Sequence, residues 1–165
     1  MIKIPKLLRS LTALSLYKLG THVSEDIDQQ KLDVRSCSRQ CLSSIQDIGD
    51  AQIQIELVNI GYGRVMSLSF CTTGGIGEEQ VKEINVVLIY ISDFLRALHE
   101  GRNEYWYPQF QPLPLLARRT EEQLEEEGAN EELEAQISSN GLDGYIKKQA
   151  NKVKAETLNC FIHSS

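Results

Sequence analysis

The sequence lacks several features that mark common classes of protein. Its formal net charge is −6, so the positive surplus that phosphate backbones require is missing, and we expect no nucleic-acid partner. Only four prolines occur, which excludes a proline-rich linker protein. The most apolar window, residues 84–98, is shorter than a bilayer span of about 18 residues and contains Asp93 and Arg96. We therefore predict no transmembrane segment in this chain.

Cysteine and histidine are also scarce. The four cysteines are Cys37, Cys41, Cys71 and Cys160. Cys37 and Cys41 lie on one face of a predicted helix, but a zinc site would need two more ligands at suitable spacing. None of the three histidines is paired at ligand spacing. We therefore predict no metal site, and we expect the thiols to be buried and reduced.

Motifs of catalysis are missing as well. The segments GYGRV and TGGIGEE do not have the glycine spacing of a dinucleotide loop, and no Walker-type lysine follows them. The G-x-S-x-G motif of a nucleophilic serine is absent. The glutamates occur in consecutive runs rather than as two carboxylates in different environments. We therefore expect no enzyme activity, no catalytic residue and no cofactor.

The first 24 residues carry bases without acids. The basic residues are Lys3, Lys6, Arg9 and Lys18, and the first acid in the chain is Glu25. Leucines at positions 7, 8, 11 and 14 complete the pattern of a basic amphipathic helix. Three interpretations are open: the first helix of the fold, a mitochondrial transit peptide, or a helix that binds a membrane surface or a partner.

Apolar spacing predicts helices along the next part of the chain. One predicted helix is marked by Leu32, Cys37, Cys41, Leu42 and Ile45. Two short helices follow over residues 53–60 and 65–70, and Gly61 between them is placed as a helix-terminating glycine. A strand is the alternative for residues 64–71, because small and large side chains alternate there.

A loop over residues 72–77, which hold three glycines, precedes the longest predicted helix. One face of that helix is an apolar seam in which residues recur at intervals of three and four: Val81, Ile84, Leu88, Ile91, Leu95 and Leu98. Other apolar residues cover much of its remaining circumference: Val86, Val87, Ile89 and Phe94. A helix that is apolar nearly all round is buried on more than one side, as a layer inside an α-solenoid is.

Beyond Asn103 the sequence concentrates prolines and aromatic residues. Three prolines within seven residues disfavour a continuous helix. The aromatic residues are Tyr105, Trp106, Tyr107 and Phe110. Two interpretations are open: the cluster caps the end of the helical core, or it forms an exposed site for a protein partner.

Glutamate dominates residues 120–136, which contain eight of them. This composition predicts a solvated helical stretch or an acidic linker. A docking surface for a basic partner is the alternative, with Glu125 and Glu126 as candidate contacts. Residues 141–162 then predict a weaker amphipathic helix that packs back onto the body and carries lysines on its other face.

Two stretches resemble an armadillo repeat. IQIELVNIGYGRVMSLSF ends its first short helix at Gly61, the position of the glycine that allows the sharp turn in that family. EEQVKEINVVLIYISDFLRAL follows after a loop and corresponds to the long third helix. The resemblance covers residues 51–98, and more loosely 31–50 as the third helix of a preceding repeat. It implies an all-α fold, an armadillo-like α-solenoid made of a superhelical stack of short-short-long helix repeats.

A narrower resemblance joins LVNIGYGRVMSLS to FLRALHEGRNEYWYPQF. Together they are similar to the homology domain shared by inositol trisphosphate receptors and ryanodine receptors, which is itself an armadillo-like solenoid. The corresponding positions are Leu95, Glu100, Gly101, Asn103, Gln109 and Phe110. Arg102 separates a glycine and an asparagine that are usually adjacent in that family. The resemblance implies a relation to the cytosolic regulatory region of intracellular calcium-release channels.

These observations lead to one set of expectations. We expect an N-terminal basic amphipathic helix and linker over residues 1–30, armadillo-like repeats over 31–117, and an acidic helical segment with a C-terminal helix over 118–165. We expect a non-enzymatic protein-binding scaffold in the cytoplasm. Its partners are proteins of unidentified type, or a larger membrane-associated assembly on the cytosolic face of an intracellular membrane.

Two alternatives to this function follow from the same sequence. The chain is a mitochondrially imported helical protein if residues 1–24 are a transit peptide. An importin-like adaptor is the other alternative within the armadillo fold. Importin-like adaptors use tryptophan on their third helices, whereas the single tryptophan here, Trp106, follows the long helix.

Overall fold

A computed structural model describes residues 4–18, 21–71, 78–138 and 144–158 of the chain, and these residues form an all-α structure. In chain order the helices are α1 Ile4–Ser15, α2 Glu25–Ile48, α3 Ala51–Asn59, α4 Tyr62–Cys71, α5 Glu78–Glu100, α6 Pro114–Glu126, α7 Ala129–Ser138 and α8 Gly144–Leu158. Within these ranges the only β-type pairing is an isolated bridge between Arg102 and Phe110.

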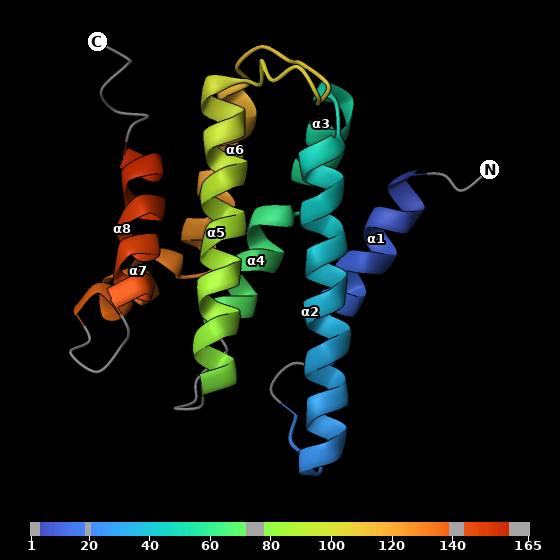
Figure 1. The fold of residues 1–165 in the computed structure, drawn as a ribbon, viewed down its shortest axis with the longest axis vertical. Helices are drawn as coiled ribbons and strands as arrows, with labels where there is room; N and C mark the ends of the chain where they lie inside the picture. The colour runs from blue at the N-terminus through green and yellow to red at the C-terminus, as the bar shows by residue number, and fades with distance from the viewer. Residues whose placement is uncertain (1–3, 19–20, 72–77, 139–143, 159–165) are drawn as a thin grey trace.

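The three longest helices lie side by side and run in the same direction (Figure 1). They are α2, α5 and α8, with α5 between the other two. The shorter helices α4 and α6 pack against α5 and against each other, and α7 packs mainly on α8. Helix α1 packs on α2 at one side of the molecule. Helix α5 is therefore the central element.

The two short helices α3 and α4 are joined as predicted. Asp50 begins α3, because its side chain accepts a hydrogen bond of 3.0 Å from the backbone N–H of Ile53. Gly61 has a φ of +80°, a left-handed conformation that suits glycine at the end of a helix. The helix prediction for residues 65–70 is confirmed, and the strand alternative is wrong. Ser67 and Ser69 alternate with apolar residues, yet both are buried inside α4.

Apolar side chains of α5 form the middle of the core. The fully buried members are Val87, Leu88, Leu95 and Leu98, and Ile84, Ile91 and Phe94 are almost as deeply buried. The Phe94 ring packs edge-on against Tyr62 of α4, with 4.6 Å between the ring centroids. The predicted burial of α5 on more than one side is thus confirmed, because α4, α6 and α8 all contact it.

Polar contacts, by contrast, join α2 to α5. Arg39 is buried and forms an ion pair with Glu83 of α5, and Ser36 donates a hydrogen bond of 3.2 Å to the same carboxylate. Arg39 also donates to the carbonyl oxygen of Ser15 at 3.2 Å, which ties α1 into the same network. Burial lowers the pKa of Arg39 to about 10, with a further contribution from the positive charge of Arg35.

Of three further predictions, two can be compared with the structure. The predicted C-terminal helix is confirmed as α8, which buries Ile146, Ala150 and Val153 against the body. The predicted loop over residues 72–77 lies outside the described residues. The expectation of buried thiols is wrong for Cys37 and Cys41, which are exposed on the outward face of α2.

The predicted segment boundaries fall inside helices. The boundary between residues 30 and 31 lies within α2, and the boundary between residues 117 and 118 lies within α6. None of the helices that the structure describes has the length and apolar character needed to cross a membrane.

Candidate partner-binding surface

The segment between α5 and α6 presents the aromatic residues, and Gly101 sets its direction. Gly101 follows the last turn of α5 with a φ of +75°, and its N–H donates to the carbonyl oxygen of Ala97 at 3.0 Å. A Cβ atom at this position would lie 2.6 Å from the carbonyl oxygen of Phe110. Only glycine therefore lets the chain turn back so closely on itself here.

Both ends of the segment are held by backbone hydrogen bonds. The N–H of Arg102 donates to the carbonyl oxygen of Phe110 at 2.8 Å, and the N–H of Phe110 donates back to Arg102 at 3.0 Å. Further along, the N–H of Leu113 donates to the carbonyl oxygen of Leu98 at 2.8 Å. We call residues 103–107 the aromatic loop, and these bonds fix its two ends against the C-terminal end of α5.

The Arg102 side chain attaches this segment to α2. Its guanidinium group donates hydrogen bonds of 3.0 Å to the carbonyl oxygens of Gly49 and Gln46, at the C-terminal end of α2. A cation is favoured there, because the last carbonyl groups of a helix carry partial negative charge. The same guanidinium group lies 4.9 Å from the centre of the Phe110 ring. Phe110 is consequently buried and belongs to the support of the loop.

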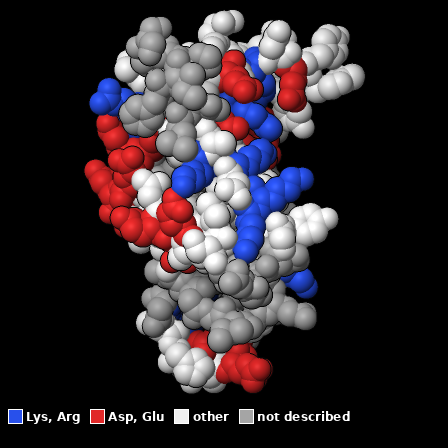
Figure 2. Space-filling model, turned by 90° about the vertical axis from the view of Figure 1, so that its left-hand side faces the viewer, with Lys and Arg blue, Asp and Glu red and all other residues white. Residues whose placement is uncertain are grey.

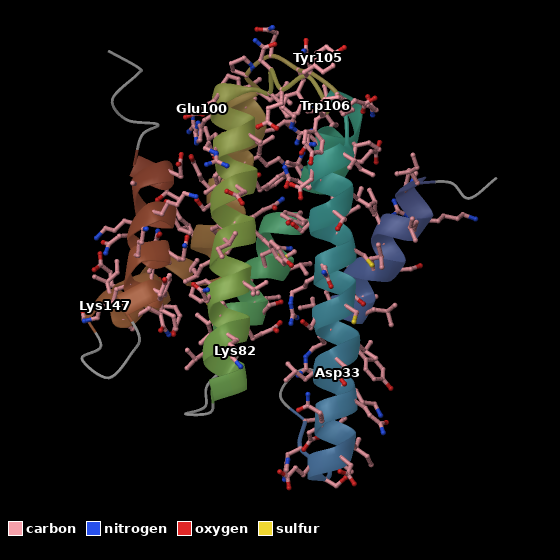
Figure 3. All side chains as sticks on the ribbon, in the orientation of Figure 1. Asp33, Lys82, Glu100, Tyr105, Trp106 and Lys147 are labelled. Atoms are coloured by element: carbon pink, nitrogen blue, oxygen red, sulfur yellow. The ribbon has the colours of Figure 1, made fainter. Side chains whose placement is uncertain are left out.

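Tyr105 and Trp106 point into solvent at the tip of the loop. Tyr105 is 85% exposed and Trp106 is 87% exposed, and Tyr107 keeps 41% of its surface exposed. Figure 3 shows Tyr105 and Trp106 at the end of the molecule where α5 ends, on the same side as Glu100. Their rings contact each other edge-on, with 5.1 Å between centroids. Two large rings are thus displayed together on a supported loop.

A groove of about 750 Å³ opens beside the aromatic loop. Its charged lining residues are Asp47, Asp93, Arg96, Glu100, Arg102 and Glu104, and Tyr107 also lines it. Arg102 already donates to backbone carbonyl groups, and Arg96 contacts Asp93 at 3.0 Å. The groove therefore keeps a negative balance.

The pKa of Asp47 is sensitive to the charges around this groove. Burial raises the pKa of Asp47, Arg102 opposes the shift, and the nearby carboxylates of Asp93 and Glu104 raise the pKa further. A positive group placed in the groove would therefore favour the ionised form of Asp47.

The other predicted contact residues lie elsewhere. Glu125 and Glu126 are exposed in the last turn of α6, whereas the aromatic loop precedes the first turn of that helix. Glu126 forms an ion pair of 2.6 Å with Arg64 of α4. Figure 2 shows acidic side chains gathered at one edge of the α7–α8 side, beside a separate group of basic ones. The structure does not bring the acidic run and the aromatic loop together.

Sequence reasoning identified the aromatic residues but missed what supports them. Arg102 was noted only as an insertion between Gly101 and Asn103, and Asp47 was not singled out. An arginine directly after a helix-ending glycine was the available indication, because such a residue is well placed to reach the carbonyl end of a neighbouring helix. In the described part of the chain no three His, Cys, Asp or Glu side chains are grouped so as to hold a metal ion.

Comparison with known proteins adds no relative. No family model matches the chain, and no curated protein and no solved structure matches it significantly.

Proposed function

We propose that this chain is a non-enzymatic protein-binding module that engages its partner through Tyr105 and Trp106. One observation carries the proposal: both rings are more than four-fifths exposed on a loop whose two ends are fixed. Exposed aromatic rings of this size commonly supply the central contacts of protein interfaces. A loop that is already held in place loses little conformational entropy on binding, which favours affinity.

The groove beside the loop indicates the chemistry of that partner. Its negative balance suits a lysine or arginine side chain, and the ring face of Tyr107, which lines the groove, attracts the same cations. An apolar neighbour of that cation would pack on the exposed ring of Tyr105. The proposed partner segment therefore combines a basic residue with an apolar one.

We further propose that the module is a short armadillo-like stack. The order of α3, α4 and α5 supports this, because two short helices of 9 and 10 residues precede one of 23. The order of α6, α7 and α8 is similar, with the longest helix last. The common direction of α2, α5 and α8 in Figure 1 is what successive third helices of such a stack would have.

A matched pair of variants tests the binding proposal. The test variant is Tyr105→Ser with Trp106→Ser, and the control is Tyr145→Ser on α8, where an aromatic side chain is 66% exposed. Each tagged full-length chain is expressed in its native source, and proteins that it labels by proximity are quantified. We expect a set of partners that is lost with the double variant and kept with the control.

Equal thermal stability of the three chains would show that the loss is not caused by unfolding. The proposal fails if the double variant and the wild-type chain label the same proteins to the same extent. It also fails if the wild-type chain enriches nothing over a tag alone.

A further inference from the structure

Helices α1 and α2 form an edge of the molecule with uncovered apolar faces (Figure 1). More than half of the large apolar side chains that are exposed in the described residues lie between Ile4 and Ile48. On α1 they are Ile4, Leu7 and Leu14, and on α2 they are Ile27, Val34 and Ile48. The edge therefore exposes more apolar surface than its share of the chain would lead one to expect.

The exposed residues of α2 form one row along the helix. Ile27, Val34, Cys41 and Ile48 follow one another at intervals of seven residues, and all four are exposed. Residues at that interval stay on one face of a helix over several turns, as they do in helix pairs. Lys31, one turn from Ile27, donates a hydrogen bond of 3.1 Å to the carbonyl oxygen of Thr21. The row thus borders the segment that follows α1.

The basic and acidic residues of α2 differ in their surroundings. All three of its basic residues have partners within the chain: Lys31 and Arg35 reach the segment that follows α1, and Arg39 reaches Glu83 of α5. Lys31 and Arg39 are buried, and Arg35 donates to the carbonyl oxygen of Tyr17 at 3.3 Å. The exposed charged residues of α2 are all acidic: Glu25, Asp26, Asp33 and Asp47. Asp47 lines the groove beside the aromatic loop, so the acids of the edge are Glu25, Asp26 and Asp33.

The charges of α1 have the opposite sign. Its two charged residues are Lys6 and Arg9, and both are exposed. Lys18 follows them, exposed as well, and no acid occurs before Glu25. At this edge α1 has an apolar face and exposed bases. It packs against α2, which has an apolar face and exposed acids.

We propose that a second copy of this chain packs against this edge, so that α1 of each protomer lies on α2 of the other. A two-fold axis achieves both contacts at once, because each chain carries the two complementary faces side by side. The apolar rows are then buried, and Lys6 and Arg9 of each copy meet the acids of the other copy's α2. The assembly closes as a dimer.

The charge pattern disfavours two other occupants of the edge. Pairing α2 with α2 of a second copy would bring acids against acids, which costs free energy at close range. An anionic membrane surface would attract α1 but would be repelled by the acids of α2 beside it. A second copy of the chain, by contrast, is complementary in charge to both α1 and α2.

Charge reversal and rescue test this proposal in the purified full-length chain. One variant carries Lys6→Glu and Arg9→Glu, and a second carries Asp26→Lys and Asp33→Lys. Sedimentation equilibrium measures the dimer dissociation constant of each variant alone and of the two mixed in equal amounts. We expect the dissociation constant of either variant alone to be at least ten times larger than that of the wild-type chain, because each variant places like charges in both contacts.

The mixture is the decisive measurement. One copy with an acidic α1 and one copy with a basic α2 restore opposite charges in both contacts, so we expect the mixed pair to dimerise like the wild-type chain. A control with Lys82→Glu and Lys148→Glu changes the same number of exposed charges outside the edge and should stay dimeric. A wild-type chain that stays monomeric, or a mixture that shows no recovery, overturns the proposal.

The exposed thiols provide a second readout. Cys41 lies in the apolar row and Cys37 is next to it on the same face, so dimerisation should slow alkylation of both by iodoacetamide as protein concentration rises. Cys71 lies on α4 and should react at a rate that does not depend on protein concentration. Rates for Cys37 and Cys41 that are also independent of concentration would count against the dimer. The aromatic loop takes no part in this contact, so this result is separate from the test of partner binding.

Discussion

Helices α2 and α5 are nearly equal in length, at 24 and 23 residues, and run in the same direction, yet they are held in the protein by different forces. Helix α5 lies between neighbours and buries aliphatic and aromatic side chains. Helix α2 lies beside the free edge, and most of the residues it buries are polar or charged: Lys31, Ser38, Arg39, Ser43 and Gln46. A long helix can therefore be anchored by non-directional apolar packing or by a few directional polar contacts.

Because α2 and α5 are held by different forces, substitutions in the two helices should affect stability differently. Apolar burial is stabilising roughly in proportion to the area removed from water, so the loss of one side chain is graded. A buried ion pair behaves otherwise, because removing one partner leaves the other charge buried and uncompensated. We therefore expect α2 to depend strongly on one contact and α5 to depend on many.

The largest expected effect tests the polar anchor of α2. Replacing Glu83 with Leu leaves Arg39 buried without its partner, and we expect the free energy of unfolding to fall by about 3–5 kcal/mol in urea denaturation. Replacing both residues, with Arg39→Met and Glu83→Leu, removes the uncompensated charge and should recover most of the loss. A double variant as unstable as the single one would contradict this account of the contact.

The next effect tests the apolar anchor of α5. Leu88 and Leu95 are fully buried, so Leu→Ala at either position should lower the free energy of unfolding by about 2–5 kcal/mol. Val86 lies on the same helix but is 36% exposed, and Val86→Ala is the matched control, which should cost clearly less. If all three variants unfold at the same urea concentration, α5 is not the centre of the core.

The smallest effect concerns the C-terminal end of α2 and depends on pH. Because burial raises the pKa of Asp47 above its ordinary value of 3.8, the folded protein binds this proton more tightly than the unfolded chain does. Ionised Asp47 therefore lowers stability at neutral pH, and this cost disappears as the pH falls through the raised pKa and below 3.8. Asp47→Asn should raise the melting temperature slightly near neutral pH.

The same comparison at low pH completes this prediction. The difference in melting temperature between Asp47→Asn and the wild-type chain should vanish below pH 3.8, where both side chains are neutral. A melting temperature of Asp47→Asn below that of the wild-type chain near neutral pH would have the wrong sign. It would mean that ionised Asp47 stabilises the fold through Arg102.

Much of the fold could be predicted because local patterns reflect local forces. The seam of α5 follows the period of a helix, and Gly61 ends α3 where a left-handed residue is required. The alternation over residues 64–71 was ambiguous, because buried serines resemble the polar face of a strand. Inside α4, Ser69 satisfies its hydroxyl group by donating to the carbonyl oxygen of Val65 at 2.7 Å. A helix can therefore bury such residues at little cost.

The candidate site could be predicted only in part. The aromatic cluster can be recognised from the sequence. Which of its rings is buried cannot: Phe110 is buried beneath Arg102, whereas Trp106 is exposed. The bond from Arg102 to Gly49 joins residues 53 positions apart in the chain. No spacing rule relates residues at that separation, so neither the support of the loop nor the groove beside it was predictable.

The sequence by itself determined the junction between α3 and α4, because a helix-ending glycine such as Gly61 acts over a few residues. It also determined that α5 has to be buried on more than one side and that α1 is basic. Only the tertiary structure decided which face of α2 is covered. Its periodicity allows several faces to turn inward, and the choice follows from the ion pair between Arg39 and Glu83 and from the bonds to residues around α1. Those contacts between distant segments bring Lys31 and Arg39 inside and leave an apolar row and acids at the free edge.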